Sequence, residues 1–130
     1  MKTKSEFLIE TDIIVDHLTQ KDLSCPSILE TAMTKGVCFT SVITASELYF
    51  IAADGFRKEA VDSVLYAINV LGIHPRYSLN ISEFFNKVAS TRDALVCSLA
   101  KNNKLPILTR EIERFKNSGI KLISPKELRG

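Results

Sequence analysis

Phe-Leu-Ile-Glu-Thr-Asp-Ile-Ile-Val-Asp-His-Leu, residues 7–18, joins a short apolar run to a longer apolar segment through acidic residues. The run 7–9 predicts a buried β-strand, because it is short, continuous and apolar. Asp12 is a good helix N-cap, and the residues that follow it give the next segment one apolar side. The stretch therefore predicts a strand that passes directly into a helix, with Glu10 where the strand ends.

The rest of the chain continues this alternation. Apolar and β-branched runs predict further strands at 37–42, 73–77, 105–109 and 120–123. The segment 73–77 is expected to be a brief edge strand, because Pro75 excludes a central position. Helical spacing and end signals predict helices at 24–36, 44–53, 56–71 and 111–115, and helical material over 81–102 with a break near residues 90–91. We therefore expect an α/β fold, a three-layer α/β/α sandwich with a mostly parallel central sheet.

Composition predicts an ordinary globule. The chain has 130 residues, 45% hydrophobic and 25% charged, so one domain over 1–130 is expected. No apolar run reaches the ~18 residues of a membrane helix, and acids interrupt the first apolar stretch before it resembles an export signal. We therefore expect a cytoplasmic protein with no membrane partner. Cys25, Cys38 and Cys97 form no Cys-x-x-Cys pair, so free thiols are expected rather than zinc ligands or disulfides.

Charge is unevenly distributed along the chain. Residues 101–130 contain eight basic and three acidic residues, a net charge of +5, which leaves −3 for residues 1–100. A basic segment beside an acidic body suits an enzyme that uses a metal and acts on a polyanion. If so, Arg110, Arg114 and Lys116 line an RNA path. The alternative is a solvated helix face with no such role.

Four acids lie just after predicted strands or in the first turns of predicted helices, and these positions should meet at one edge of a parallel sheet. They are Glu10, Glu47, Asp93 and Glu111. Carboxylates from four segments can converge there, because ligand sites of such sheets lie outside the carboxyl ends of the strands. Hard cations such as Mg²⁺ or Mn²⁺ prefer oxygen ligands, and two ions about 3.5–4 Å apart can activate water and stabilise a phosphodiester under attack.

Local helix chemistry offers an alternative for two of these acids. Residues 44–47 (Thr-Ala-Ser-Glu) and 90–93 (Ser-Thr-Arg-Asp) both have the form of a capping box. Acids in a first helical turn are also stabilised by the helix dipole without any metal. Glu10 has no such explanation, since an acid that ends a buried strand has no capping role to fill.

Four segments of the sequence resemble the motifs of the PIN-domain family. Residues 7–18 resemble its opening strand, acidic motif and helix, and 40–48 (Thr-Ser-Val-Ile-Thr-Ala-Ser-Glu-Leu) its second motif. Residues 92–100 (Arg-Asp-Ala-Leu-Val-Cys-Ser-Leu-Ala) resemble its Asp-Ala helix, and 108–115 (Leu-Thr-Arg-Glu-Ile-Glu-Arg-Phe) its Thr-x-Asp segment. The motifs occur in the family's order and span nearly the whole chain. Within the family, the size and layout resemble the VapC-like toxin ribonucleases of type II toxin–antitoxin pairs.

The resemblance implies a function and a set of site residues. It implies a metal-dependent endoribonuclease that uses Mg²⁺ or Mn²⁺, forms a homodimer and binds a small antitoxin protein. By motif position, the catalytic and metal-binding acids are Glu10, Glu47, Asp93 and Glu111. Asp12 takes the place of a further metal-site residue, beside the motif hydroxyl of Thr11; Thr109 is the threonine that ends the later strand.

Two of these acids depart from the family pattern. Glu10 and Glu111 stand where the family has aspartate. The alternative function is therefore a catalytically weakened or inactive PIN-fold module that binds RNA or protein.

Overall fold

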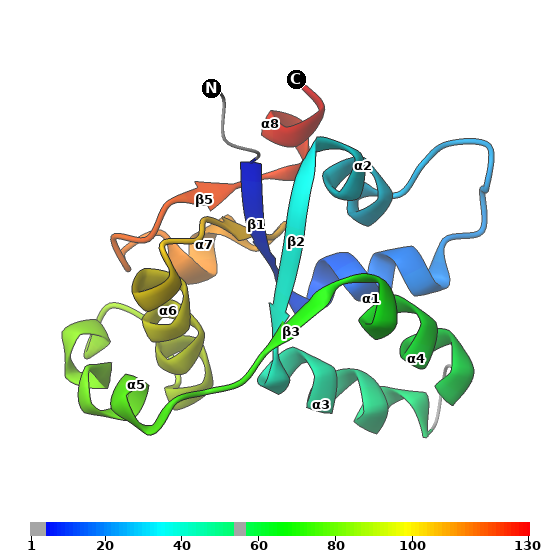
Figure 1. The fold of residues 1–130 in the computed structure, drawn as a ribbon. Helices are drawn as coiled ribbons and strands as arrows, with labels where there is room; N and C mark the ends of the chain where they lie inside the picture. Colours follow the sequence, from blue (N-terminus) through cyan, green and yellow to red (C-terminus); the bar gives the residue numbers. More distant parts are fainter. Residues whose placement is uncertain (1–4, 54–56) are drawn as a thin grey trace.

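The computed structural model describes residues 5–53 and 57–130. In these ranges the central sheet has five parallel strands in the order β3-β2-β1-β4-β5 (Figure 1). The strands are β1 (Ser5–Ile9), β2 (Gly36–Ser41), β3 (Asn69–Leu71), β4 (Ile107–Leu108) and β5 (Leu122–Ile123). Strand β1 therefore lies in the middle of the sheet, paired with β2 on one side and β4 on the other.

Helices connect the strands and cover both faces of the sheet. In the part of the chain that is described they are α1 (Thr11–Thr19), α2 (Ile28–Lys35), α3 (Val42–Ala52), α4 (Lys58–Ala67), α5 (Pro75–Leu79), the 3₁₀ helix η1 (Ile81–Phe84), α6 (Thr91–Asn103), α7 (Ile112–Phe115) and α8 (Pro125–Arg129). In Figure 1, α1 to α4 lie on one side of the sheet, and α5 and α6 on the other. The predicted α/β/α sandwich with a parallel sheet is confirmed.

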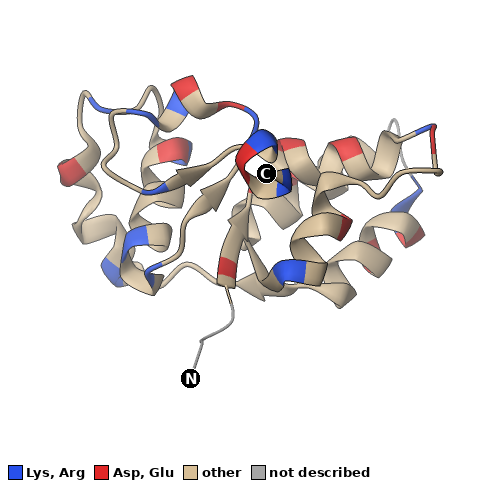
Figure 2. Ribbon diagram, turned by 90° about the horizontal axis from the view of Figure 1, so that it is seen from above, with Lys and Arg blue, Asp and Glu red and all other residues tan. Residues whose placement is uncertain are grey.

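The core has two parts, one on each face of the sheet. Alternate residues of β1 point to opposite faces: Phe7 and Ile9 pack with α1, α2, α4 and α8, whereas Leu8 packs with α6 and α7. The described strands carry only one charged residue, Glu6, and the other charges lie on helices and loops (Figure 2). A sheet that is covered on both faces requires such apolar strands.

The region after α4 differs from the expectation. A helix at 56–71 and an edge strand at 73–77 were expected, but α4 ends at Ala67, and the edge strand is Asn69–Leu71. This strand pairs with β2, and α5 begins directly at Pro75. Pairing with β2 outweighs the helical spacing of 68–71, and proline is favourable at the first position of a helix. Phe56, the expected first residue of α4, lies outside the described residues.

Helix ends account for two further differences. The second helix begins at Ile28 rather than near residue 24, because Ser27 and Glu30 form the capping box. Another capping box, at Ser124 and Glu127, begins the short helix α8, which was not expected. Both boxes are local hydrogen-bond patterns that the sequence contains but that compete with other nearby start signals.

The cysteines are free thiols. Cys25 is exposed, whereas Cys38 and Cys97 are buried. Burial raises the pKa of each buried thiol to about 11. Within residues 5–53 and 57–130, no helix is both long and apolar enough to cross a membrane.

Gly36 begins β2 opposite Ser5 of β1, which gives a test of the central pairing. Gly36 is paired with Ser5, and a Cβ atom added at Gly36 would collide with the backbone oxygen of Ser5. Gly36→Ala should therefore lower the free energy of unfolding by about 1–3 kcal/mol in urea titrations. Gly72→Ala is the control, because a Cβ there meets no heavy atom within 4 Å. Equal losses in the two variants would contradict this account.

Candidate functional site

Glu10 lies where the chain leaves the centre of the sheet. It occupies the N-cap position of α1, but its side chain makes no capping hydrogen bond. The side chain is only 2% exposed, because neighbouring strands and both helix layers enclose the end of β1. A buried carboxylate needs a charged or hydrogen-bonding partner, so the surroundings of Glu10 decide the character of this site.

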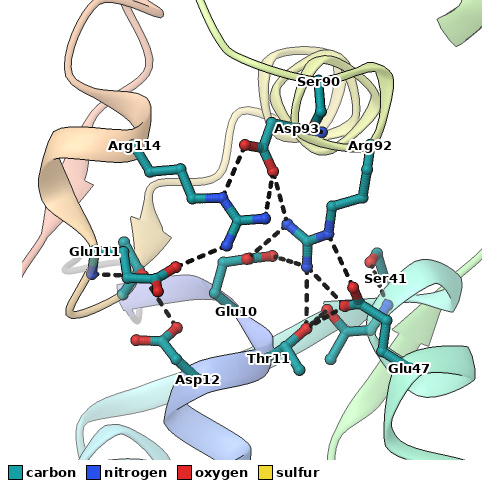
Figure 3. Close-up of polar contacts among 12 residues, drawn as sticks. Glu10, Thr11, Asp12, Ser41, Glu47, Ser90, Arg92, Asp93, Glu111 and Arg114 are labelled. Atoms are coloured by element: carbon teal, nitrogen blue, oxygen red, sulfur yellow. Dashed lines mark hydrogen bonds and ion pairs between the residues drawn. The ribbon is translucent and has the colours of Figure 1, made fainter. Parts of the chain in front are cut away.

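That partner is Arg92, in the first turn of α6. Its NH1 atom donates to Glu10 Oε2 at 2.8 Å, and NH2 donates to Oε1 at 3.3 Å (Figure 3). The same guanidinium donates to Glu47 Oε1 and Oε2 at 2.8 and 3.2 Å, and to Asp93 Oδ1 at 3.1 Å. One arginine therefore joins three of the four acids singled out in the sequence.

Glu47 reaches from α3 into this pocket rather than capping its own helix. The capping box expected at Thr44 is wrong, because α3 begins at Val42 and Ser41 Oγ accepts the capping hydrogen bond from Thr44 N. Glu47 Oε1 also accepts a hydrogen bond from Thr11 Oγ1 at 2.6 Å. The hydroxyl of Thr11 thus fixes the carboxylate beside Glu10.

Asp93 lies in the first turn of α6, and its backbone and side chain have separate roles. Its N–H donates to Ser90 Oγ at 3.1 Å, so the expected N-cap is present. Its buried carboxylate is bound by two arginines: Arg92 on one side, and on the other Arg114, which contributes Nε and NH2 at 2.8 Å each. The carboxylate is therefore part of the pocket and not of a reciprocal capping box.

Glu111 joins the pocket indirectly. Arg114 NH1 donates to Glu111 Oε2 at 2.7 Å, and the Glu111 side chain is half exposed. In the network of Figure 3, Arg114 links Glu111 to Asp93.

Asp12 has a different role from the N-cap that the sequence suggested. Helix α1 begins at Thr11, which places Asp12 in its first turn. One carboxylate oxygen accepts from Thr109 Oγ1 at 3.0 Å, and the other accepts from Arg110 N at 2.8 Å. Asp12 thereby ties α1 to the turn after β4, which carries Glu111.

Burial and arginine contacts act in opposite directions on the acids. Burial raises the pKa of Glu10 above its usual value, although hydrogen bonds from Arg92 lower it. Burial also raises the pKa of the more exposed Glu47, but hydrogen bonds from Arg92 and Thr11 together outweigh it and leave the pKa lowered. Burial lowers the pKa of Arg92, but its hydrogen bonds to Glu47 and Glu10 outweigh burial and leave the pKa above its usual value. The residue therefore stays cationic.

The predicted divalent ion suits the residue types but not their arrangement. Carboxylate oxygens are the donors that Mg²⁺ and Mn²⁺ prefer. However, both oxygens of Glu10, Glu47 and Asp93 are already in contact with a guanidinium group. Among the described residues, no group of three or more Asp, Glu, His or Cys side chains could hold a metal ion. As the acids are arranged here, with Arg92 and Arg114 in place, the pocket does not fit the ion.

Sequence reasoning did not assign the two arginines to this site: it gave Arg92 no role and placed Arg114 on an RNA path. Arg92 directly precedes Asp93, and Arg114 lies one helical turn after Glu111. The spacing of Arg114 is a recognisable ion-pair signal, but nothing local shows that Arg92 turns toward Glu10.

The basic tail segment is extensively paired with acids. Arg110 pairs with Asp16, and Lys116 pairs with Glu113 at 2.6 Å. Arg114 belongs to the pocket itself. The RNA path expected along Arg110, Arg114 and Lys116 stays a prediction, and these pairs would have to exchange for contacts with phosphate.

Comparison with known proteins identifies the family. A family model of the PIN domain matches residues 7–119, and the chain belongs to the PIN-domain family. No curated protein sequence matches the chain. The match to the PIN-domain model confirms the resemblance seen in the sequence motifs.

Solved structures with the same fold include members of toxin–antitoxin systems. VapBC-1 from nontypeable Haemophilus influenzae has a TM-score of 0.76 and 15% identity, over 93% of this chain and 98% of that one. A toxin–antitoxin complex from Klebsiella pneumoniae has a TM-score of 0.71 and 18% identity, over 94% and 98%. Mycobacterium tuberculosis VapC20, described as a Sarcin-Ricin loop cleaving toxin, has a TM-score of 0.63 and 15% identity, over 92% and 98%. At these identities the likeness establishes a shared VapC-like fold.

The tie made by Asp12 can be tested separately from the pocket. Asp12→Ala leaves Thr109 Oγ1 and Arg110 N without their acceptor, so it should lower the free energy of unfolding by about 1.5–3 kcal/mol. Asp16→Ala removes an exposed ion pair from the same helix and should cost no more than about 1 kcal/mol. Chemical denaturation measures both. If the two variants lose the same stability, Asp12 is not the tie described here.

Proposed function

We propose that the chain is the ribonuclease toxin of a toxin–antitoxin pair and that it cleaves RNA at this carboxylate pocket. The observation that carries the proposal is that Glu10, Glu47 and Asp93 meet at the end of the central strand from three separate segments. Membership of the PIN family and the fold shared with VapC20 support a nuclease.

The acids have defined roles in this proposal. Glu10, Glu47, Asp93 and Glu111 form the catalytic group, and Mg²⁺ or Mn²⁺ is the proposed cofactor. Cofactor binding requires that Arg92 first leave the carboxylates, because it occupies their oxygens. The role of Asp12 as a further metal ligand is less well supported by its contacts, since both of its oxygens already accept hydrogen bonds.

A small antitoxin and a second copy of the chain are the proposed protein partners. Like the Klebsiella pneumoniae toxin–antitoxin complex, the proposed assembly combines this fold with an antitoxin. Helix α3 exposes Val42, Phe50 and Ile51, and Phe50 is 81% exposed. Exposed apolar groups of this kind, close together on one helix, are typical of surfaces that a protein partner covers.

A second candidate function has an observation of its own. The arginine contacts to all three buried or half-buried acids favour a PIN-fold module that binds RNA or protein without cleaving it. In that case the arginines neutralise the acids permanently, and the pocket is a structural remnant of a catalytic site.

Cleavage of RNA separates the two candidates. Purified wild-type protein should degrade total bacterial RNA in the presence of Mn²⁺ and lose this activity when EDTA is added. Asp93→Asn should reduce the rate by about a hundredfold or more, because even a misplacement of about 1 Å in a catalytic group can have that effect. Gel electrophoresis of the RNA over time gives the rates.

The control is Asp16→Asn, which removes an equal charge from the exposed face of α1 and should cleave at the wild-type rate. Thermal unfolding of each variant shows whether the fold is kept. Intact RNA with folded wild-type protein at every Mn²⁺ concentration would reject the nuclease and leave the binding module.

A further inference from the structure

Arg92 uses all of its guanidinium nitrogens within one pocket. Nε contacts Glu47, NH1 contacts Glu10 and Asp93, and NH2 contacts Glu10, Glu47 and the hydroxyl of Thr11 at 3.0 Å. Every partner accepts a hydrogen bond, and three of them are carboxylates. The guanidinium of Arg92 therefore occupies the position of a cation at the centre of an anionic site.

We propose that the Arg92 guanidinium is the resident cation of the carboxylate pocket and competes with divalent metal ions for the same oxygens. The chain thereby holds its own site closed, and a divalent ion binds only when Arg92 withdraws. This inference concerns cation binding and does not require that the chain cleave RNA.

The position of Arg92 supports a role in the pocket rather than in helix stability. It is the second residue of α6, where the positive end of the helix dipole favours acids and disfavours a basic side chain. Its contacts with carboxylates from β1–α1, α3 and α6 compensate for this unfavourable position. The planar guanidinium also matches the two oxygens of Glu10, which a lysine ammonium could not do.

The surroundings of Arg92 leave it a way out. Its side chain is 19% exposed, compared with 2% for Glu10 beneath it. An open groove borders it, lined by Thr11, Val42, Ile43, Ser46, Glu47, Phe50 and Ile51 together with Arg92 itself. In this proposal the guanidinium turns into this groove while α6 stays folded. Arg114, on the far side of Asp93, remains to neutralise part of the charge.

Without Arg92, Glu10 and Glu47 need another cation, whereas Asp93 keeps its contacts with Arg114. Glu10 and Asp93 are almost fully buried, and Glu47 lies beside them, so their mutual repulsion is poorly screened by solvent. A compact divalent ion is the natural replacement, because it binds several carboxylate oxygens at once. Removal of the arginine should therefore create or strengthen a metal site rather than destroy one.

Manganese binding to the full-length protein tests the proposal directly. A pocket that Arg92 occupies about 90% of the time binds an ion about tenfold more weakly than the same pocket without it. Arg92→Gln should therefore bind Mn²⁺ at least about tenfold more tightly than wild type, measured by electron paramagnetic resonance of free Mn²⁺. Mn²⁺ should also raise the melting temperature of this variant more than that of wild type.

Two further variants locate the effect. Arg76→Gln removes the same charge from exposed α5, outside the pocket, and should bind Mn²⁺ as wild type does. Addition of Glu10→Gln to Arg92→Gln should abolish the gain, because Glu10 is the carboxylate that Arg92 alone covers. If Arg92→Gln does not fold, Arg92→Lys keeps the charge without the planar group, and it should bind Mn²⁺ more tightly than wild type.

Equal Mn²⁺ affinity in wild type and in the folded Arg92 variant would overturn the proposal, as would an equal gain in Arg76→Gln. The result is separate from the fate of the proposed ribonuclease. If Arg92→Gln gains Mn²⁺ affinity but the protein cleaves no RNA, this inference stands and the nuclease is rejected. If the protein cleaves RNA but Arg92→Gln has the Mn²⁺ affinity of wild type, the nuclease stands and this inference is rejected.

Discussion

The ion pair between Glu10 and Arg92 connects the centre of the sheet to both helix layers. Glu10 follows β1, the strand in the middle of the sheet, and Arg92 comes from α6 on one face. The same guanidinium holds Glu47 of α3, which belongs to the other face. Burial of such charges is costly, and the pair is tolerated only because each oxygen of Glu10 has a donor. Removal of Arg92 would leave the buried Glu10 carboxylate without its donors, whereas removal of Glu10 would leave Arg92 in contact with Glu47 and Asp93.

The order of the strands explains why the acids gather at this point. From β1 the chain builds outward to β2 and β3 on one side, and later to β4 and β5 on the other. The connections therefore diverge at the carboxyl end of β1, where open parallel sheets form their ligand sites. Glu10 lies at this point, Glu47 lies on the helix after β2, and the turn after β4 carries Glu111. Asp93, from the helix before β4, completes the pocket.

Two sets of contacts give the pocket its present state. Asp12 and Thr11 hold the outer acids: Asp12 fixes the turn that carries Glu111, and Thr11 fixes Glu47. Arg92 and Arg114 fill the space between the carboxylates. A nuclease and a binding module of this family would share the first set of contacts. They would differ in the second, since only a nuclease needs the carboxylate oxygens to become free. The pairing of the acids with arginine is thus the feature on which the functional distinction depends.

The sequence by itself determined the alternation of strands and helices, the parallel sheet and the family. Short apolar runs and helical spacing are local signals, and motifs in a fixed order need no tertiary contacts to be recognised. It also singled out Glu10, Glu47 and Asp93, because strand ends and helix starts in a parallel sheet meet at one edge. It failed at residues 68–77, where pairing with β2 outweighed a local helical pattern.

Only the tertiary structure decided what surrounds the acids. Glu47 is a pocket residue and not a capping residue because Ser41, rather than Thr44, is the N-cap of α3. Asp12 connects α1 to the turn after β4 because this turn packs against α1. The backbone N–H of Arg110, which donates to Asp12, lies 98 residues further along the chain. Arg92 lies 82 residues from Glu10 in the sequence. The neighbouring residue Asp93 does not indicate in which direction the Arg92 side chain points. Such partners depend on how α6 packs on the sheet, and no local pattern of residues records that packing.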